Sequence, residues 1–100
     1  MTVRHFVTWK LAAEDAATRA ADAEGIRTNL EALVGVVPGL RALSVHANTL
    51  YPENNWDIIL ESELDDAEAL AAYQVHPEHL KVVEYVKPRV TERASIDFAV

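Results

Sequence analysis

The chain opens with a strict alternation of side chains. Over residues 3–11, one face carries the mainly apolar set Val3, His5, Val7, Trp9 and Leu11, and the other carries Arg4, Phe6, Thr8 and Lys10. A period of two is typical of a β-strand, because successive side chains point to opposite sides of a sheet. The sequence therefore predicts a first strand with one face in the core.

The period becomes helical over residues 13–36, which are rich in alanine and charged residues. One apolar stripe at helical spacing consists of Ile26, Leu30, Leu33, Val34 and Val37. Gly25 lies inside this segment and is expected to interrupt or kink the helix. Pro38 and Gly39 are expected to end it and to turn the chain.

Shorter elements follow in the rest of the chain. The patterns predict strands over 40–47, 56–64 and 90–99, a loop over 48–55, and helices over 66–74 and 77–86. Asp65 and Asp66 precede the first of these helices as capping residues, and Pro77 suits the first turn of the second. Ala94, Ile96 and Phe98 share one face of the last strand.

The element order is therefore β-α-β-β-α-β within one domain over residues 1–100. Two split βαβ units of this kind make an α+β, ferredoxin-like fold, a four-stranded antiparallel sheet with its helices on one face. The opposite face has no helix to cover it, although it carries Phe6, Thr8 and Ile59. Burial of this face against a second copy is the commonest solution, so we expect a homodimer through the open sheet face.

Composition narrows the classes of partner. There is no cysteine, which excludes disulfides, thiolate metal sites and cysteine nucleophiles. The formal net charge of −7 disfavours nucleic acid and anionic membrane surfaces as partners. The chain starts without the pattern of a secretory signal and has no apolar run of membrane-spanning length. We therefore expect a cytoplasmic protein.

Candidate chemistry gathers in residues 73–79, where Tyr73, His76 and His79 follow at intervals of three. A phenol and an imidazole there could stand at the mouth of a cavity between helices and sheet. The alternative is structural, with His76 capping a helix and His79 packing on its own helix. His5, among apolar neighbours, is more often a hydrogen-bonded core residue than a functional one. His76, Glu78 and His79 do not form a recognised metal-ligand pattern, so no metal site is expected.

Four segments together resemble the stress-responsive A/B-barrel family. They are Val3-Arg4-His5-Phe6-Val7, Val37-Pro38-Gly39-Leu40, Tyr73 to His79, and Ile96-Asp97-Phe98. The resemblance implies a dimeric α+β barrel, in which two ferredoxin-like subunits place their sheets face to face. The family includes plant stress proteins and the plant olivetolic acid cyclase, which closes a polyketide by aldol condensation. Some members hold a cation on backbone carbonyls near the turn that corresponds to Val34, Val37 and Leu40.

Similarity to the cyclase implies roles for three residues. His79 would take a proton from an activated carbon, Tyr73 would hydrogen-bond the carbonyl oxygen, and His5 would line the pocket. The pocket-lining set expected here is Val7, Trp9, Leu30, Ile58 and His76. Leu30 and Ile58 stand where the cyclase has a tyrosine and a histidine, so this pocket should be more apolar. No cofactor is implied.

The function expected from these features is binding of a small apolar or aromatic molecule in one pocket per subunit. As an enzyme, the protein would be a cofactor-independent cyclase or lyase. Related dimeric barrels include cofactor-independent monooxygenases, so oxidation is a variant by fold analogy. The alternative from another class is a non-catalytic stress or structural protein. A deep pocket that holds both His79 and Tyr73 would favour catalysis.

Overall fold

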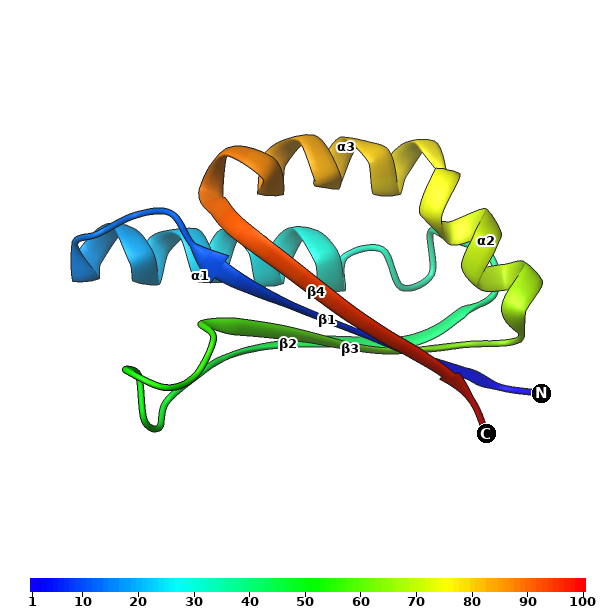
Figure 1. Cartoon of the computed structure of the whole chain (residues 1–100). Helices are drawn as coiled ribbons and strands as arrows, with labels where there is room; N and C mark the ends of the chain where they lie inside the picture. Colours follow the sequence, from blue (N-terminus) through cyan, green and yellow to red (C-terminus); the bar gives the residue numbers. More distant parts are fainter.

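A four-stranded antiparallel sheet carries all the helices on one of its faces (Figure 1). This is a computed structural model, and it describes residues 1–100. The elements in chain order are β1 (Val3–Leu11), α1 (Ala16–Glu31), β2 (Leu40–Ala47), β3 (Ile58–Leu64), α2 (Ala67–Val75), α3 (Pro77–Val86), the 3-10 turn η1 (Lys87–Arg89) and β4 (Val90–Ala99). The sheet order is β2-β3-β1-β4. The predicted ferredoxin-like α+β fold is confirmed.

The predicted ends of most elements agree with the structure, and β3 is one exception. It starts at Ile58 rather than at Trp56. The residue between them, Asp57, anchors the loop: its carboxylate accepts from the Leu11 N–H (2.8 Å) and from the Arg19 guanidinium (2.7 Å). The Asp57 backbone also donates to the Trp9 carbonyl (3.0 Å) and accepts from the Asn48 N–H (2.8 Å), so this residue ties the start of β3 to both of its neighbours.

Helix α1 is shorter than predicted but is not interrupted. It ends at Glu31, and the chain then turns through Gly35, whose φ is +87°. Leu33 and Val37 nevertheless stay in the core, so the apolar stripe continues beyond the helix. Gly25 lies within unbroken helix, contrary to expectation. A Cβ there would stand 2.0 Å from the hydroxyl of Tyr85, so this glycine allows α1 and α3 to approach closely.

Caps on the two later helices fit the sequence. Asp66 begins α2 by accepting from the Ala69 N–H (2.8 Å). His76 ends α2 and begins α3, where its Nδ1 accepts from the Glu78 N–H (3.1 Å). The proline that follows, Pro77, occupies the first turn of α3, where its missing N–H costs nothing. The chain therefore changes direction at residue 76.

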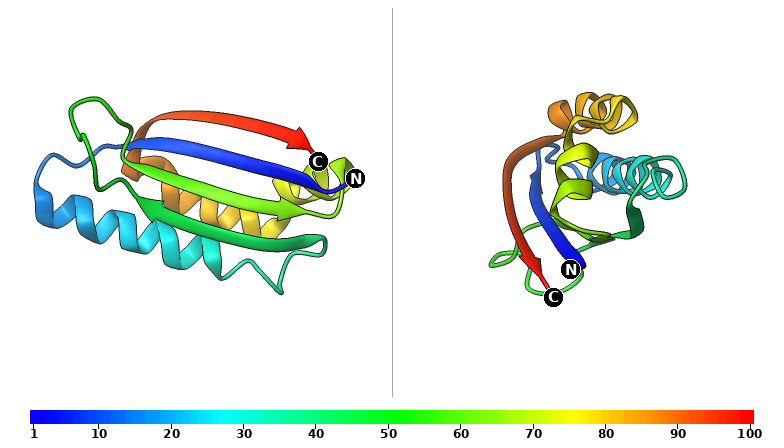
Figure 2. Two further views of the ribbon diagram at one scale, coloured as in Figure 1. Left: turned by 90° about the horizontal axis from the view of Figure 1, so that it is seen from below. Right: turned by 90° about the vertical axis from the view of Figure 1, so that its right-hand side faces the viewer.

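The sheet has one covered face and one open face. The core lies between the sheet and the helices, with Val7, Leu60 and Val45 on the strands and Ile26 and Leu30 on α1. Seen from below, no helix crosses the other face (Figure 2). None of the helices is long and apolar enough to pass through a membrane.

Candidate functional site

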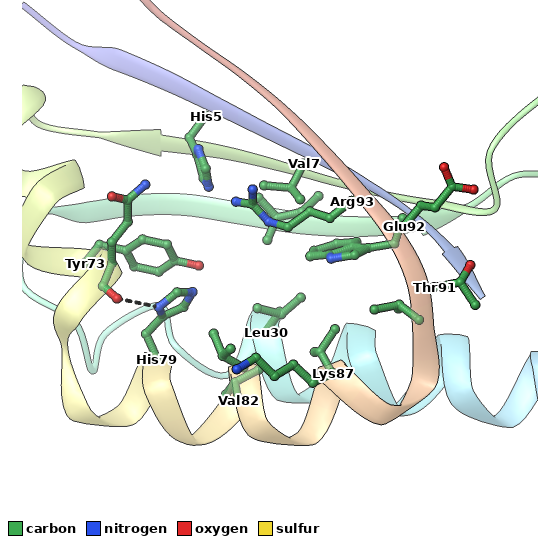
Figure 3. Close-up of a pocket in the computed structure, with 16 residues that line it drawn as sticks. His5, Val7, Leu30, Tyr73, His79, Val82, Lys87, Thr91, Glu92 and Arg93 are labelled. Atoms are coloured by element: carbon green, nitrogen blue, oxygen red, sulfur yellow. Dashed lines mark hydrogen bonds between the residues drawn. The ribbon is translucent and has the colours of Figure 1, made fainter. Parts of the chain in front are cut away.

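A cavity of about 350 Å³ lies between the sheet and helices α2 and α3 (Figure 3). Its walls are mainly apolar, and polar groups converge on it from four elements: His5 on β1, Tyr73 on α2, His79 on α3 and Arg93 on β4. The β4 residues at its rim are exposed, so the cavity opens along this edge of the sheet. Apolar walls with a few convergent polar groups are typical of small-molecule sites.

The break between α2 and α3 brings Tyr73 and His79 together. In an uninterrupted helix, residues six apart point about 240° apart around the axis. Here the chain turns at His76, and the Tyr73 and His79 rings lie 4.2 Å apart between centroids. The sequence feature that ends one helix therefore also builds the site.

His79 is held in a defined tautomer. Its Nδ1 lies 3.2 Å from the carbonyl oxygen of Gln74. A carbonyl only accepts, so Nδ1 carries the proton and Nε2 keeps its lone pair in the neutral ring. Partial burial lowers the pKa of His79; the Gln74 hydrogen bond opposes this, and the nearby His5, Arg93 and His76 add to the lowering. The ring is therefore neutral and able to accept a proton at neutral pH.

The Tyr73 hydroxyl has no partner. The side chain is 1% exposed, and its oxygen makes no hydrogen bond in the protein. Burial raises the pKa of Tyr73, while Arg93 acts in the opposite direction. The hydroxyl points into the cavity in Figure 3 and stays protonated, so it can donate a hydrogen bond to a ligand there. Unsatisfied buried polar atoms are rare and commonly mark a functional site or a bound water.

His5 and Asp97 form a hydrogen-bonded pair. His5 is 3% exposed, and its Nδ1 contacts the carboxylate of Asp97 on the paired strand β4. The His5 ring lies edge-on to the Tyr73 ring at 6.0 Å between centroids. A carboxylate on one ring nitrogen fixes the orientation of the other. His5 is thus both a hydrogen-bonded core residue and a wall of the cavity.

The structure brings most of the expected site residues to this cavity. The expected residues that line it are His5, Tyr73, His79, Val7, Trp9 and Leu30. Ile58 does not: it is buried elsewhere in the core, toward the β2 side of the sheet. His76 does not line it either, because its ring is used as the N-cap of α3. The capping alternative holds for His76.

Two functional candidates escaped the sequence interpretation, and both lie on β4. Arg93 and Asp97 are four residues apart and face the helices, opposite Trp9 and His5 in the ladder. The alternation that places Ala94, Ile96 and Phe98 on one face leaves these residues on the other. The alternation therefore places both residues on the helix-facing side, but only the pairing of β4 with β1 shows that they lie beside the cavity-lining residues of β1.

No group of three or more histidine, cysteine, aspartate or glutamate side chains lies close enough to hold a metal ion. The side chains that converge on the cavity include two imidazoles, a phenol and a guanidinium, and Lys87 also belongs to its lining. These groups donate or accept protons and bind oxyanions, so the chemistry that the site can offer is acid–base chemistry.

Comparison with known proteins identifies the family. The model of the stress responsive A/B barrel domain matches residues 3–100. None of the curated proteins matches the sequence. Among solved structures, a dimeric protein of unknown function with a ferredoxin-like fold from Bacteroides fragilis is 26% identical, with a TM-score of 0.89 over 99% of this chain and 96% of that one.

Two enzymes share the fold at lower identity. The hydroxynitrile lyase of Passiflora edulis is 13% identical, with a TM-score of 0.80 over 99% of this chain and 93% of that one. SnoaB, a cofactor-independent oxygenase from Streptomyces nogalater, is 12% identical, with a TM-score of 0.78 over 99% and 92%. At such identities the similarity shows a common fold only.

Proposed function

The chain belongs to the stress-responsive A/B barrel domain family, and we propose that it binds a small carbonyl compound in the cavity and moves a proton on it, as a cofactor-independent cyclase or lyase. The observation that carries this proposal is the pairing of two groups at one cavity. The buried Tyr73 hydroxyl lacks an acceptor, and the adjacent His79 keeps a free ring nitrogen. An incoming carbonyl oxygen would satisfy the first, and an acidic C–H would meet the second.

The proposed step is proton abstraction next to a carbonyl. Nε2 of His79 takes the proton from the carbon, and the electron pair moves to the carbonyl oxygen. The Tyr73 hydroxyl donates a hydrogen bond to that oxygen, where the negative charge develops. In a cyclase, the carbanion then attacks a second carbonyl carbon of the same molecule and forms a C–C bond. The new alkoxide takes the proton back from His79.

His5 is proposed as a positioning residue. Its ring meets Tyr73 edge-on and is tied to Asp97, so it fixes the wall against which the phenol rests. The Gln74 carbonyl does the same for His79, because it favours the tautomer with the lone pair on Nε2. Preorganised groups of this kind stabilise charge without moving during the reaction.

We also propose that the protein works as a homodimer through its open sheet face. The Phe6 and Phe98 rings stack there at 5.7 Å between centroids, and Ile96 beside them is 70% exposed. The ion pairs Arg4–Glu63 and Lys10–Glu92 lie at the margins of this apolar patch. An apolar centre with a charged rim is typical of an interface. The dimeric state of the Bacteroides fragilis neighbour supports the proposal.

Hydrogen–deuterium exchange tests the proton transfer without knowledge of the natural substrate. The protein is incubated in D₂O with aromatic β-diketones, and loss of the α-proton signal is followed by NMR. We expect the protein to accelerate exchange, and His79→Gln to remove the acceleration. His46→Gln is the matched control, because His46 is exposed on β2 and does not line the cavity.

The outcomes separate the candidate functions. Exchange that is equal in the wild type and His79→Gln would contradict the role of His79 as base. Binding of the diketones in the cavity without any exchange would support the non-catalytic binding protein. Consumption of O₂ during the incubation would indicate the oxygenase chemistry that the fold also hosts in SnoaB.

A further inference from the structure

We infer that the ligand of this cavity carries a carboxylate, which Arg93 binds. This inference rests on the proposed function, since it specifies the molecule that the same cavity takes. It departs from the apolar or aromatic ligand expected from the sequence. The apolar walls would hold the body of the molecule, and its anionic end would lie at β4.

Arg93 is the one arginine of the chain without a carboxylate partner. The chain has six arginines, and five of them form ion pairs: Arg4 with Glu63, Arg19 with Asp57, Arg27 with Glu24 and Glu31, Arg41 with Asp65, and Arg89 with Asp22. Arg93 makes no ion pair and no side-chain hydrogen bond. Although the chain has sixteen acidic residues and a net charge of −7, none of its carboxylates would compete with a ligand for this guanidinium.

The Arg93 side chain points into the cavity rather than away from the protein. It belongs to the helix-facing side of β4, directly opposite Trp9 in the ladder. In Figure 3 it extends along the cavity toward the end where His5, Tyr73 and His79 lie. Its charge acts on both Tyr73 and His79, which places it within electrostatic reach of the two groups. Its neighbour Glu92, by contrast, pairs with Lys10 on the open face.

The acidic residue that shares this face of β4 with Arg93 already has a hydrogen-bond partner. Asp97, on the same side of β4, contacts His5 instead of Arg93. The guanidinium is therefore left free to form the two parallel N–H···O bonds that match a carboxylate. The other cation on the lining, Lys87, has Glu84 as its partner at 3.9 Å, so Arg93 is the cation left for a ligand. One guanidinium suits a monoanion better than a phosphate dianion, which would leave one charge uncompensated.

The arrangement fixes how such a molecule would lie. Its carboxylate would meet Arg93, its carbonyl oxygen would face Tyr73 and His79, and its hydrocarbon part would contact Val7, Leu30 and Val82. A cavity of about 350 Å³ lies within the usual range for small-molecule sites. The ligand class is thus a keto acid or acyl carboxylate with an aromatic or branched body.

Matched probes test the inference by isothermal titration calorimetry, with the binding site located by NMR. The probes are 4-phenylbutyrate, its neutral amide and phenyl phosphate, each titrated into the wild type, Arg93→Gln and Arg41→Gln. Arg41 is an exposed arginine on β2 outside the cavity, so its variant makes the same charge change elsewhere. Arg93 has no partner to lose, and a native-like NMR spectrum of Arg93→Gln would verify its fold.

We expect the wild type to bind the carboxylate about tenfold or more tightly than the amide, the usual effect of one charge-assisted pair. Arg93→Gln should remove this preference and leave the affinity for the amide unchanged, whereas Arg41→Gln should keep it. Three results would overturn the inference without contradicting binding in the cavity. They are equal affinities for the carboxylate and the amide, a preference for the carboxylate that survives in Arg93→Gln, and tighter binding of phenyl phosphate. If no probe perturbs the cavity, the binding proposal itself is wrong.

Discussion

Replacement of Tyr73 by phenylalanine should stabilise the protein and impair its function. The hydroxyl is buried and unpartnered, so the folded state lacks a hydrogen bond that the unfolded chain makes with water. The phenyl ring keeps its contacts with His5 and His79, because only one oxygen is removed. The change therefore isolates the cost of burying the hydroxyl.

The magnitude follows from that cost. Burial of an unsatisfied polar group costs about 1–3 kcal/mol. We expect Tyr73→Phe to raise the free energy of unfolding by about 1 kcal/mol, which for a domain of this size corresponds to a rise in Tm of roughly 4 °C or more. Under the proposed mechanism, the same variant loses the donor to the oxyanion, so its rate of α-proton exchange should fall about 100-fold.

Urea unfolding followed by circular dichroism measures the first effect, and the D₂O exchange assay measures the second. Protein concentration is held constant, because self-association would otherwise shift the midpoint. Tyr51→Phe serves as the control, since Tyr51 is exposed in the loop before β3 and should change neither property. A clear loss of stability in Tyr73→Phe would mean that the hydroxyl is hydrogen-bonded in the resting protein, and the reasoning would fail.

Three further predictions concern pH, assembly and helix packing. Because the pKa of His79 is lowered in the folded state, the unfolded chain takes up a proton first as the pH falls below about 6.5. Protonation of His79 should therefore lower the free energy of unfolding below that pH and leave it unchanged above. An NMR titration of the His79 ring with a midpoint at or above 6.5 would contradict this. Ile96→Asp should place a charge in the centre of the open face and yield a monomer in analytical ultracentrifugation. The control Leu50→Asp, in the exposed loop, should leave the dimer intact. A dimer that persists in Ile96→Asp would count against the proposed interface. Gly25→Ala should gain about 1 kcal/mol of helix propensity, but the new methyl group would clash with the Tyr85 hydroxyl. The substitution should therefore stabilise the protein more in a Tyr85→Phe background than in the wild type. Additive effects on the free energy of unfolding in this double-mutant cycle would exclude the contact.

The sequence predicts the fold well because strand alternation is a local property. The bounds of β1, β2 and β4 follow from side-chain period alone, and the caps at Asp66 and His76 follow from local chemistry. The end of α1 could not be predicted in this way. Its apolar stripe continues through Leu33 and Val37, and tertiary packing keeps both buried after the backbone has left the helix.

The candidate site was partly predictable for a similar reason. Tyr73 and His79 stand close in sequence, and the break at Pro77 indicates that their helices bend. The pair of His5 and Asp97 joins residues 92 positions apart, and Arg93 lies on an exposed edge strand where polar residues are ordinary. Only the ladder between β1 and β4 distinguishes these residues from surface charges.

Strand β4 serves two opposite surfaces with alternate residues. Arg93 and Asp97 face the helices, and Ile96 and Phe98 face outward with Phe6. An insertion or deletion of one residue after η1 would reverse every side chain of the strand. Isoleucine and phenylalanine would then enter the cavity, and the guanidinium would emerge among the apolar rings. Indels in this strand should therefore be tolerated only in pairs of residues, whereas point changes on either side remain independent.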